Sequence, residues 1–441
     1  MSINKPNHDS LLLVLPITFI ESNDKLFIDQ QTYNGIRLWL DNFQSVTIAC
    51  FSQNVDLSDK NFVPIDALVS FDRLILISMP NACKPFTFIR HLPSVVSTLR
   101  QAISRSHHLC FMLWGLWGDW GSVASLVASR SDRHYVIWTD TVASRVLEIQ
   151  AADKSGMQKI YVQTIARLTG HYEKYVIGKS VAGLFHGMDT YKYYSPFSHN
   201  PQLVHNIHLG PEFRISPEDL LKKLARPANN LLQIVYAGRV HPDKGLLDWL
   251  ETLAKLKVDN VEFKATWFGD GPQLKAARDF VKTHNLDEWV SFPGPMSDRK
   301  LLLEAIRTAD IFMFCHKTPE SPRCLIEALL SGTPIVGYGS HYSEDLIAVH
   351  GGGVLVSQST TLLTDAVRRL SRDRRRLADL QERAAKDGFP MTDEHVFQHR
   401  SQLLRDALPH PAFVHQYNDA ALAASRSKLA NASPVLKRDG F

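Results

Sequence analysis

Residues 310–338 read DIFMFCHKTPESPRCLIEALLSGTPIVGY, and this pattern predicts a strand, a polar loop, a helix and a second strand. The run Ile311–Phe314 is short and apolar between polar neighbours, as in strands buried on both faces of a parallel sheet. Leucine and isoleucine then recur at helical spacing until Gly332-Thr333-Pro334 ends the helix. The stretch therefore predicts a βαβ unit whose ligands bind where the first strand ends and the helix begins.

Two acidic residues flank the first turn of this predicted helix. Glu327 lies two helical turns beyond Glu320, so we expect it to face the loop that carries Glu320. Between them, the backbone N–H groups near Arg323 and Cys324 are suited to holding a phosphate. One carboxylate could then accept hydrogen bonds from a sugar or a ribose. The alternative is a solvated acid together with a capping acid.

Length and composition limit the classes of protein to which the chain can belong. At 441 residues it exceeds what one hydrophobic core usually supports, which predicts two domains of roughly 200 residues each. The formal net charge of +4 favours anionic ligands weakly and argues against a nucleic-acid partner. The 5 cysteines are scattered without a Cys-x-x-Cys pair, which argues against a zinc site and for a reducing cytosol. The early apolar run Leu11–Ile20 contains Pro16 and has no basic leader, so we expect a strand.

The first part of the chain alternates strands with helices, which predicts a doubly wound α/β domain. The helical stretch Phe86–Ile103 carries a basic face; we favour packing against a core, with a membrane-surface helix as the alternative. Trp117 and Trp120 lie in a glycine-rich loop, where stacking on sugar rings and packing are equally plausible roles. Residues at such strand ends are candidates for contacting a ligand: Gly35 at a strand-to-helix turn, Trp117, Asp119, Asp140 and His186.

The second part begins after the polar stretch Pro217–Asn230, with the expected strand Leu231–Ala237. In the turn that follows, Arg239 and Lys244 stand on either side of Pro242. An arginine fork and a lysine point charge aimed at one spot suit a diphosphate, whereas solvated surface charge is the alternative.

Three motifs occur in order along this second part: Gly238-Arg239…Lys244-Gly245, Gly269-Asp270-Gly271-Pro272, and Glu320…Glu327 within SPRCLIEALLSGTPIV. Together they resemble the retaining family-4 glycosyltransferases of GT-B fold, specifically over residues 231–380 and more loosely before them. The resemblance implies an α/β protein in which two Rossmann-like doubly wound domains face each other across a cleft. The expected divisions are an acceptor domain (1–216), a linker (217–230), a nucleotide-sugar domain (231–395), and a C-terminal helix returning toward the first domain with a frayed tail (396–441).

The resemblance also implies roles for individual residues. Arg239, Lys244 and Glu320 would be catalytic, the two cations binding the donor diphosphate and Glu320 contacting the donor sugar. The implied donor-binding residues are Gly238, Gly269, Gly271, Pro293, Arg323, Cys324, Leu325 and Glu327, the last on the ribose. No metal or other cofactor is expected, because the cations replace the metal and the chain has no Asp-x-Asp motif. We expect a UDP-sugar donor in preference to a GDP-sugar.

Two departures from the family pattern keep alternatives open. The family usually separates its glutamates by eight residues, whereas Glu320 and Glu327 are seven apart, and Thr139-Asp140 stands where a strand-end histidine is often found. The leading hypothesis is a cytoplasmic enzyme that glycosylates a glycan, polysaccharide or lipid-linked acceptor, with a peripheral contact at the inner face of a membrane. The alternatives are a catalytically degenerate partner subunit and a related enzyme acting on a small phosphorylated sugar.

Overall fold

The computed structural model describes residues 9–22, 25–54, 62–68, 70–152, 154–227, 231–296, 298–318 and 321–408. These residues form two compact units. The first unit contains the chain up to Phe185, Tyr193–Gln202 and the described residues from Phe397 onward. The second unit contains His186–Lys192 and Leu203–Val396.

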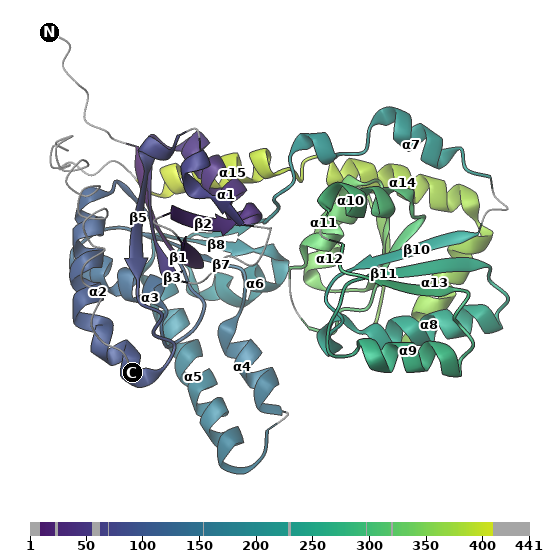
Figure 1. Ribbon diagram of the computed structural model, residues 1–441, viewed down its shortest axis with the longest axis horizontal. Helices are drawn as coiled ribbons and strands as arrows, with labels where there is room; N and C mark the ends of the chain where they lie inside the picture. Colours follow the sequence, from purple (N-terminus) through teal and green to yellow (C-terminus); the bar gives the residue numbers. More distant parts are fainter. Residues whose placement is uncertain are drawn as a thin grey trace, which may run out of the picture. The chain divides into compact units, whose positions relative to one another are not determined.

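The first unit is built on a sheet that is parallel at its centre (Figure 1). Adjacent strands run in the order β5-β3-β1-β6-β7-β8-β9, and β2 and β4 extend it by antiparallel pairing from β1. Its strands are β1 (Ser10–Ser22), β2 (Lys25–Asp29), β3 (Ser45–Asn54), β4 (Phe62–Pro64), β5 (Leu74–Met79), β6 (His108–Met112), β7 (Val136–Thr139), β8 (Ala182–His186) and β9 (Pro201–Val204). The early apolar run is therefore part of β1, as predicted.

Helices pack around this sheet and bury their apolar stripes. The helices are α1 (Gln30–Asn42), α2 (Pro85–Arg105), α3 (Trp120–Arg130), α4 (Ala143–Ala152) and α5 (Gly156–Lys179). Two further helices are divided between the units: α6 (Gly187–Tyr194) belongs to the second unit up to Lys192, and α15 (Asp393–Ala407) belongs to the first unit from Phe397. Helix α2 buries Val95, Leu99 and Ile103 and contacts α3, which agrees with the core-packed interpretation of this stretch.

The second unit is a parallel sheet in the order β12-β11-β10-β13-β14-β15. Numbered from its first strand this order is 3-2-1-4-5-6, the order of a Rossmann domain. The strands are β10 (Leu232–Ala237), β11 (Phe263–Phe268), β12 (Val290–Gly294), β13 (Ile311–Phe314), β14 (Ile335–Tyr338) and β15 (Gly353–Val356). The helices are α7 (Pro217–Leu224), α8 (Leu246–Val258), α9 (Leu274–Thr283), α10 (Arg299–Thr308), α11 (Arg323–Leu330), α12 (His341–Leu346), α13 (Thr360–Arg372) and α14 (Arg374–Gly388).

The stretch 310–338 forms β13, α11 and β14, with Phe312 paired to Ile335, so the predicted βαβ unit is confirmed. The predicted linker 217–230, in contrast, begins with helix α7. Ser216 caps this helix by accepting from the backbone N–H of Asp219 (3.0 Å), and Pro217 occupies its first turn, where no N–H is needed. The proline that suggested a linker is instead a helix-start signal.

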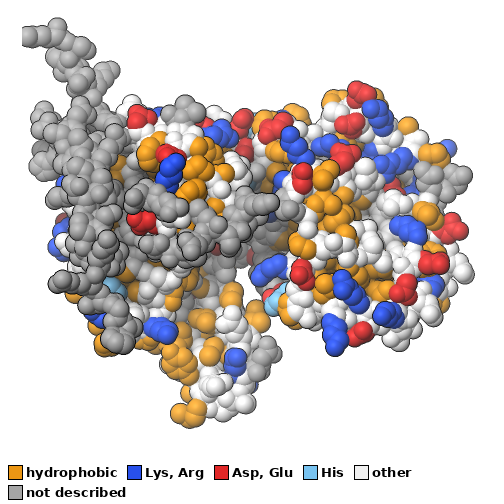
Figure 2. Space-filling model, in the orientation of Figure 1, with side chains coloured by type: hydrophobic (Ala, Val, Ile, Leu, Met, Phe, Trp, Pro, Cys, Tyr) orange, Lys and Arg blue, Asp and Glu red, His pale blue; other side chains and the backbone are white. Residues whose placement is uncertain are grey.

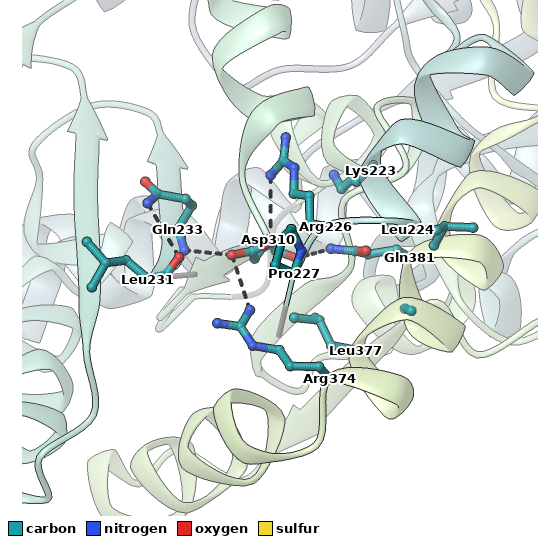
Figure 3. A pocket seen from close by; sticks show the side chains of 11 residues that line it. Lys223, Leu224, Arg226, Pro227, Leu231, Gln233, Asp310, Arg374, Leu377 and Gln381 are labelled. Carbon is teal, nitrogen blue, oxygen red and sulfur yellow. Dashed lines mark hydrogen bonds and ion pairs between the residues drawn. The ribbon is translucent and has the colours of Figure 1, made fainter. Parts of the chain in front are cut away.

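A charged network closes the amino edge of the second sheet (Figure 3). Asp310, just before β13, accepts from the backbone N–H of Gln233 in β10 (2.8 Å) and forms ion pairs with Arg226 and Arg374. These groups line a pocket of about 360 Å³. The buried Lys223 beside them donates to Thr333 Oγ1 (2.6 Å) and to the carbonyl of Arg307 (2.9 Å). The network therefore links β10 and β13 at their beginnings.

A buried carboxyl group lies on α5 in the first unit. Glu173 is fully buried and accepts from Ser144 Oγ of α4 (2.9 Å) and from the side chain of Tyr194. Burial raises the pKa of Glu173 to about 7, against an ordinary 4.5, and the hydrogen bonds oppose this rise. The folded protein therefore holds this proton more tightly than the unfolded chain does.

We predict that this carboxyl group makes stability depend on pH. Because its pKa is higher in the folded state, its contribution is complete below pH 4.5 and declines as pH rises to about 7. The loss is on the order of 3 to 4 kcal/mol, since one pKa unit corresponds to about 1.4 kcal/mol. Urea unfolding of Glu173→Gln should show a flatter pH dependence across this interval than the parent protein. Glu148→Gln, at an exposed position of α4, should match the parent; equal profiles for all three proteins would contradict the prediction.

Candidate active site

The candidate site lies at the carboxyl edge of the second sheet, where the strand order reverses between β10 and β13. The loop after each strand contacts the other: the N–H of Lys317 donates to the carbonyl of Asp243 (2.9 Å). Gly245 lies in this contact with a φ of +67°, and a Cβ there would lie 2.0 Å from the carbonyl oxygen of Cys315. Glycine is therefore required for the two loops to approach this closely.

Lys244 is placed at this junction. It ends the short helical turn Pro242–Lys244, directly before α8, and its side chain is buried. Arg239, on the same loop, is exposed. The structure therefore carries both predicted diphosphate-binding cations on one loop at the strand-order reversal, the ligand-binding position of such sheets.

His316 is a neighbour of Lys244 that sequence reasoning missed. It follows β13, is buried, and its Nε2 lies 2.7 Å from the hydroxyl oxygen of Tyr236 in β10. Burial first, and the charge of Lys244 second, hold the pKa of His316 well below its ordinary value. His316 is therefore a neutral imidazole at neutral pH, within electrostatic reach of Lys244. The only signal in the sequence was its place two residues after a predicted strand.

The glycine-rich turns bring several other predicted donor-binding residues to the same edge. A Cβ at Gly269 would lie 2.0 Å from the carbonyl oxygen of Gly238, so the turns after β10 and β11 touch through their backbones. The N–H of Gly269 also donates to the carbonyl of Gly294 (3.0 Å), next to Pro293 at the end of β12. Gly271 makes a similar approach to the carbonyl of Val240.

Helix α11 begins at Arg323 with Pro322 as its N-cap, so the first turn that we predicted for Ser321–Cys324 begins two residues later: Arg323 and Cys324 lie in it, and Ser321 precedes the helix. Glu327 is buried on this helix and forms an ion pair with Arg299, the first residue of α10. Arg299 carries no signal in the sequence, because it joins Glu327 through the packing of α10 beside α11. Glu320 lies outside the described residues, so its relation to Glu327 stays a prediction.

The first-unit candidates are less consistent with a site. Gly35 was expected at a strand-to-helix turn, and this prediction is wrong: it is buried inside α1. The helix begins earlier because Asp29 accepts hydrogen bonds from the backbone N–H groups of Gln31 (3.1 Å) and Thr32 (3.0 Å). Asp140 follows β7 directly and is partly exposed, with Thr141 donating to it (3.0 Å).

Asp119 has a structural environment. It caps α3 and accepts from Ser122 N (2.9 Å), Ser122 Oγ (2.7 Å), Trp114 N (3.2 Å) and Gly115 N (3.3 Å). Burial raises its pKa, and these hydrogen bonds oppose the rise. Its carboxylate therefore holds the glycine-rich loop before α3 in place through these hydrogen bonds.

Aromatic packing accounts for the tryptophans of this loop. Trp120 is buried, stacks on Phe88 at 4.9 Å and donates to the carbonyl of Pro80 (2.9 Å). Trp117 is partly buried and meets Phe88 edge-on at 5.7 Å. Packing is thus the role that the structure gives Trp120.

His186 ends β8 but belongs to the second unit. Its backbone carbonyl accepts from Ser321 Oγ (2.7 Å), two residues before α11 begins. This places the backbone of His186 close to the first turn of α11.

Known proteins resemble both the second unit and the whole fold. Residues 219–387 match the family model described as Glycosyl transferases group 1. The chain is 29% identical over 164 residues to an exopolysaccharide phosphotransferase of Streptomyces coelicolor, covering 36% of this chain and 17% of that protein. It is 28% identical over 123 residues to the 2-deoxystreptamine glucosyltransferase of Streptomyces kanamyceticus, covering 28% of this chain and 31% of that protein. The chain thus spans less than a third of the length of either relative.

Among solved structures, HepE of Anabaena in complex with UDP aligns with a TM-score of 0.61 at 14% identity, covering 90% of this chain and 98% of that one. This similarity, together with two sheets whose central strands are parallel, identifies the architecture. The chain has the GT-B fold of two Rossmann-like domains, and its residues 219–387 match the glycosyl transferases of group 1.

Proposed function

We propose that the protein is a retaining glycosyltransferase that moves a hexosyl group from a UDP-sugar to a glycan, polysaccharide or glycolipid acceptor. The observation that carries the proposal is the placement of Lys244, His316 and the first turn of α11 around the junction of β10 and β13, inside the segment that matches the glycosyl transferases. The name of the glucosyltransferase relative and the UDP in the HepE structure support the donor class.

In this proposal the second unit stabilises the departing nucleotide. Lys244 and Arg239 would bind the diphosphate oxygens, and the N–H groups of the first turn of α11 would add partial positive charge. Charge developing on the leaving phosphate would then meet groups already in place, a preorganised electrostatic effect. We propose that these cations supply the stabilisation without a metal. The described residues contain no group of three or more His, Cys, Asp or Glu suited to hold a metal ion.

Glu327 would accept hydrogen bonds from the ribose, and Glu320 would contact the donor sugar. Arg299 already pairs with Glu327, so in this proposal it fixes the carboxylate in its buried position. We also infer a peripheral contact with a membrane, where a lipid-linked acceptor would lie. None of the described helices is long and apolar enough to cross a bilayer.

If the donor site is as proposed, the protein should bind UDP, and calorimetry can measure the affinity. Lys244→Ala and Glu327→Ala should each weaken binding by about tenfold or more, because each removes charge-assisted hydrogen bonds worth about 1.5–3 kcal/mol. Lys386→Ala, at an exposed position of α14, should bind UDP like the parent protein. Unchanged affinity in both site variants would refute the assignment.

If Glu327 binds the ribose, loss of Arg299 should affect uridine and UDP alike, unlike loss of Lys244. In Arg299→Ala the buried Glu327 loses its ion-pair partner, so we expect weaker binding of uridine and UDP by a similar factor, several-fold. Lys244→Ala should weaken UDP binding but leave uridine binding unchanged, because uridine has no phosphate. Lys300→Ala, exposed beside Arg299, is the control. Normal uridine binding by Arg299→Ala would exclude this role.

The proposed reaction predicts the anomeric configuration of the product and a rate that does not depend on a metal ion. With UDP-glucose or another UDP-hexose and a panel of glycan and glycolipid acceptors, proton NMR should show the donor's anomeric configuration in the first product formed. Added EDTA should leave the rate unchanged. An inverted product would refute retention, and UDP binding without consumption of any donor would support a degenerate binding protein instead.

A further inference from the structure

Helices α4 and α5 form an antiparallel hairpin that projects from the sheet of the first unit (Figure 1). One side of α5 is used for packing: Ala166, Thr169, Glu173, Val176 and Ile177 are buried, with Glu173 bonded to Ser144 on α4. This contact accounts for the inward side of the helix.

The opposite side of α5 is also apolar, and it is exposed. It carries the residues Met157, Ile160, Tyr161, Leu168 and Tyr175, each more than half exposed. Their spacing of three, four, eleven and eighteen residues from Met157 places them on one face of a helix. Figure 2 shows hydrophobic side chains over the projecting end of the hairpin. A helix that is apolar on both sides normally buries both, so this face lacks a partner among the described residues.

The hairpin that carries this exposed face has an excess of basic residues. Residues 143–179 contain six Lys and Arg against three Asp and Glu, and one of those acids is the buried Glu173. Lys154, Lys159 and Arg167 are exposed and form no ion pair with any described residue. The hairpin is therefore suited to a partner that offers an apolar layer for the exposed side chains and negative charges for the cations.

The positive charge of the hairpin distinguishes between two candidate partners, a second copy of the chain and a membrane. A second copy of the chain would bring the same excess of positive charge against this hairpin, which disfavours self-association. An anionic bilayer offers acyl chains for Met157, Ile160 and Leu168, an interfacial zone for the tyrosines, and phosphates for the cations.

We propose that the outer face of the α4–α5 hairpin binds the surface of an anionic membrane, with α5 lying in the lipid headgroup region. This names the surface responsible for the membrane contact inferred above and depends on that contact, but not on the donor chemistry. It would hold the first unit at the bilayer, where a lipid-linked acceptor is found.

Cosedimentation of the full chain with vesicles tests the proposal. Vesicles of phosphatidylcholine containing phosphatidylglycerol should bind the protein, and vesicles of phosphatidylcholine alone should bind it at least about tenfold more weakly. The variant Met157→Ser/Ile160→Ser/Leu168→Ser should lose about tenfold or more of its affinity for the anionic vesicles. Absence of binding to anionic vesicles, or equal binding by this variant, would overturn the proposal.

Matched controls separate this surface from general effects. Val258→Ser/Val349→Ser/Leu362→Ser removes exposed apolar side chains from the second unit and should bind vesicles like the parent protein. UDP binding should be the same in every variant, and circular dichroism with a thermal melt like that of the parent should show that each is folded. A dimer seen by light scattering that is lost in the α5 variant, without vesicle binding, would assign the face to a second copy. Vesicle binding by a protein that fails to bind UDP would refute the donor proposal alone.

Discussion

The parallel pairing of β10 with β13 is the interaction on which the candidate site depends. Ile234 pairs with Ile311 and Val235 with Phe312, across the point where the order of the strands reverses. At the amino edge, Asp310 joins the strands through the backbone of Gln233 and two arginines. At the carboxyl edge, the same pairing brings the loop of Lys244 against the loop of His316. A change of register would therefore separate the cation from the imidazole.

Close backbone approach shapes the edge that carries the candidate site. Gly245 and Gly269 lie where a Cβ would overlap the carbonyl oxygen of a neighbouring loop. Without side chains at these positions, three strand ends converge, and their backbone groups and cations share a small region. The hydrophobic core below holds the strands, whereas the glycines allow the loops to meet, so core and site impose different requirements on the sequence.

Local patterns explain which parts of this arrangement could be predicted. The β13–α11–β14 unit and the glycine turns were found because short apolar runs, helical spacing and turn residues act over a few neighbours. Arg299 with Glu327, and Lys244 with His316, were missed because their contacts depend on tertiary packing. Gly35 was placed wrongly because Asp29 starts α1 before the glycine is reached.

The same distinction applies to the surface of the first unit. The sequence drew attention to Phe86–Ile103, because its apolar residues follow one clear stripe, and that stripe packs against α3. Helix α5 gives no such signal, since apolar residues lie on both of its sides and the periodicity cancels. Only the structure distinguishes the side that Glu173 and its neighbours bury from the side that Met157 and Leu168 leave exposed. A single apolar stripe therefore predicts which side of a helix is buried. When a helix is apolar on two sides, only the structure shows which side is packed and which is left for another partner.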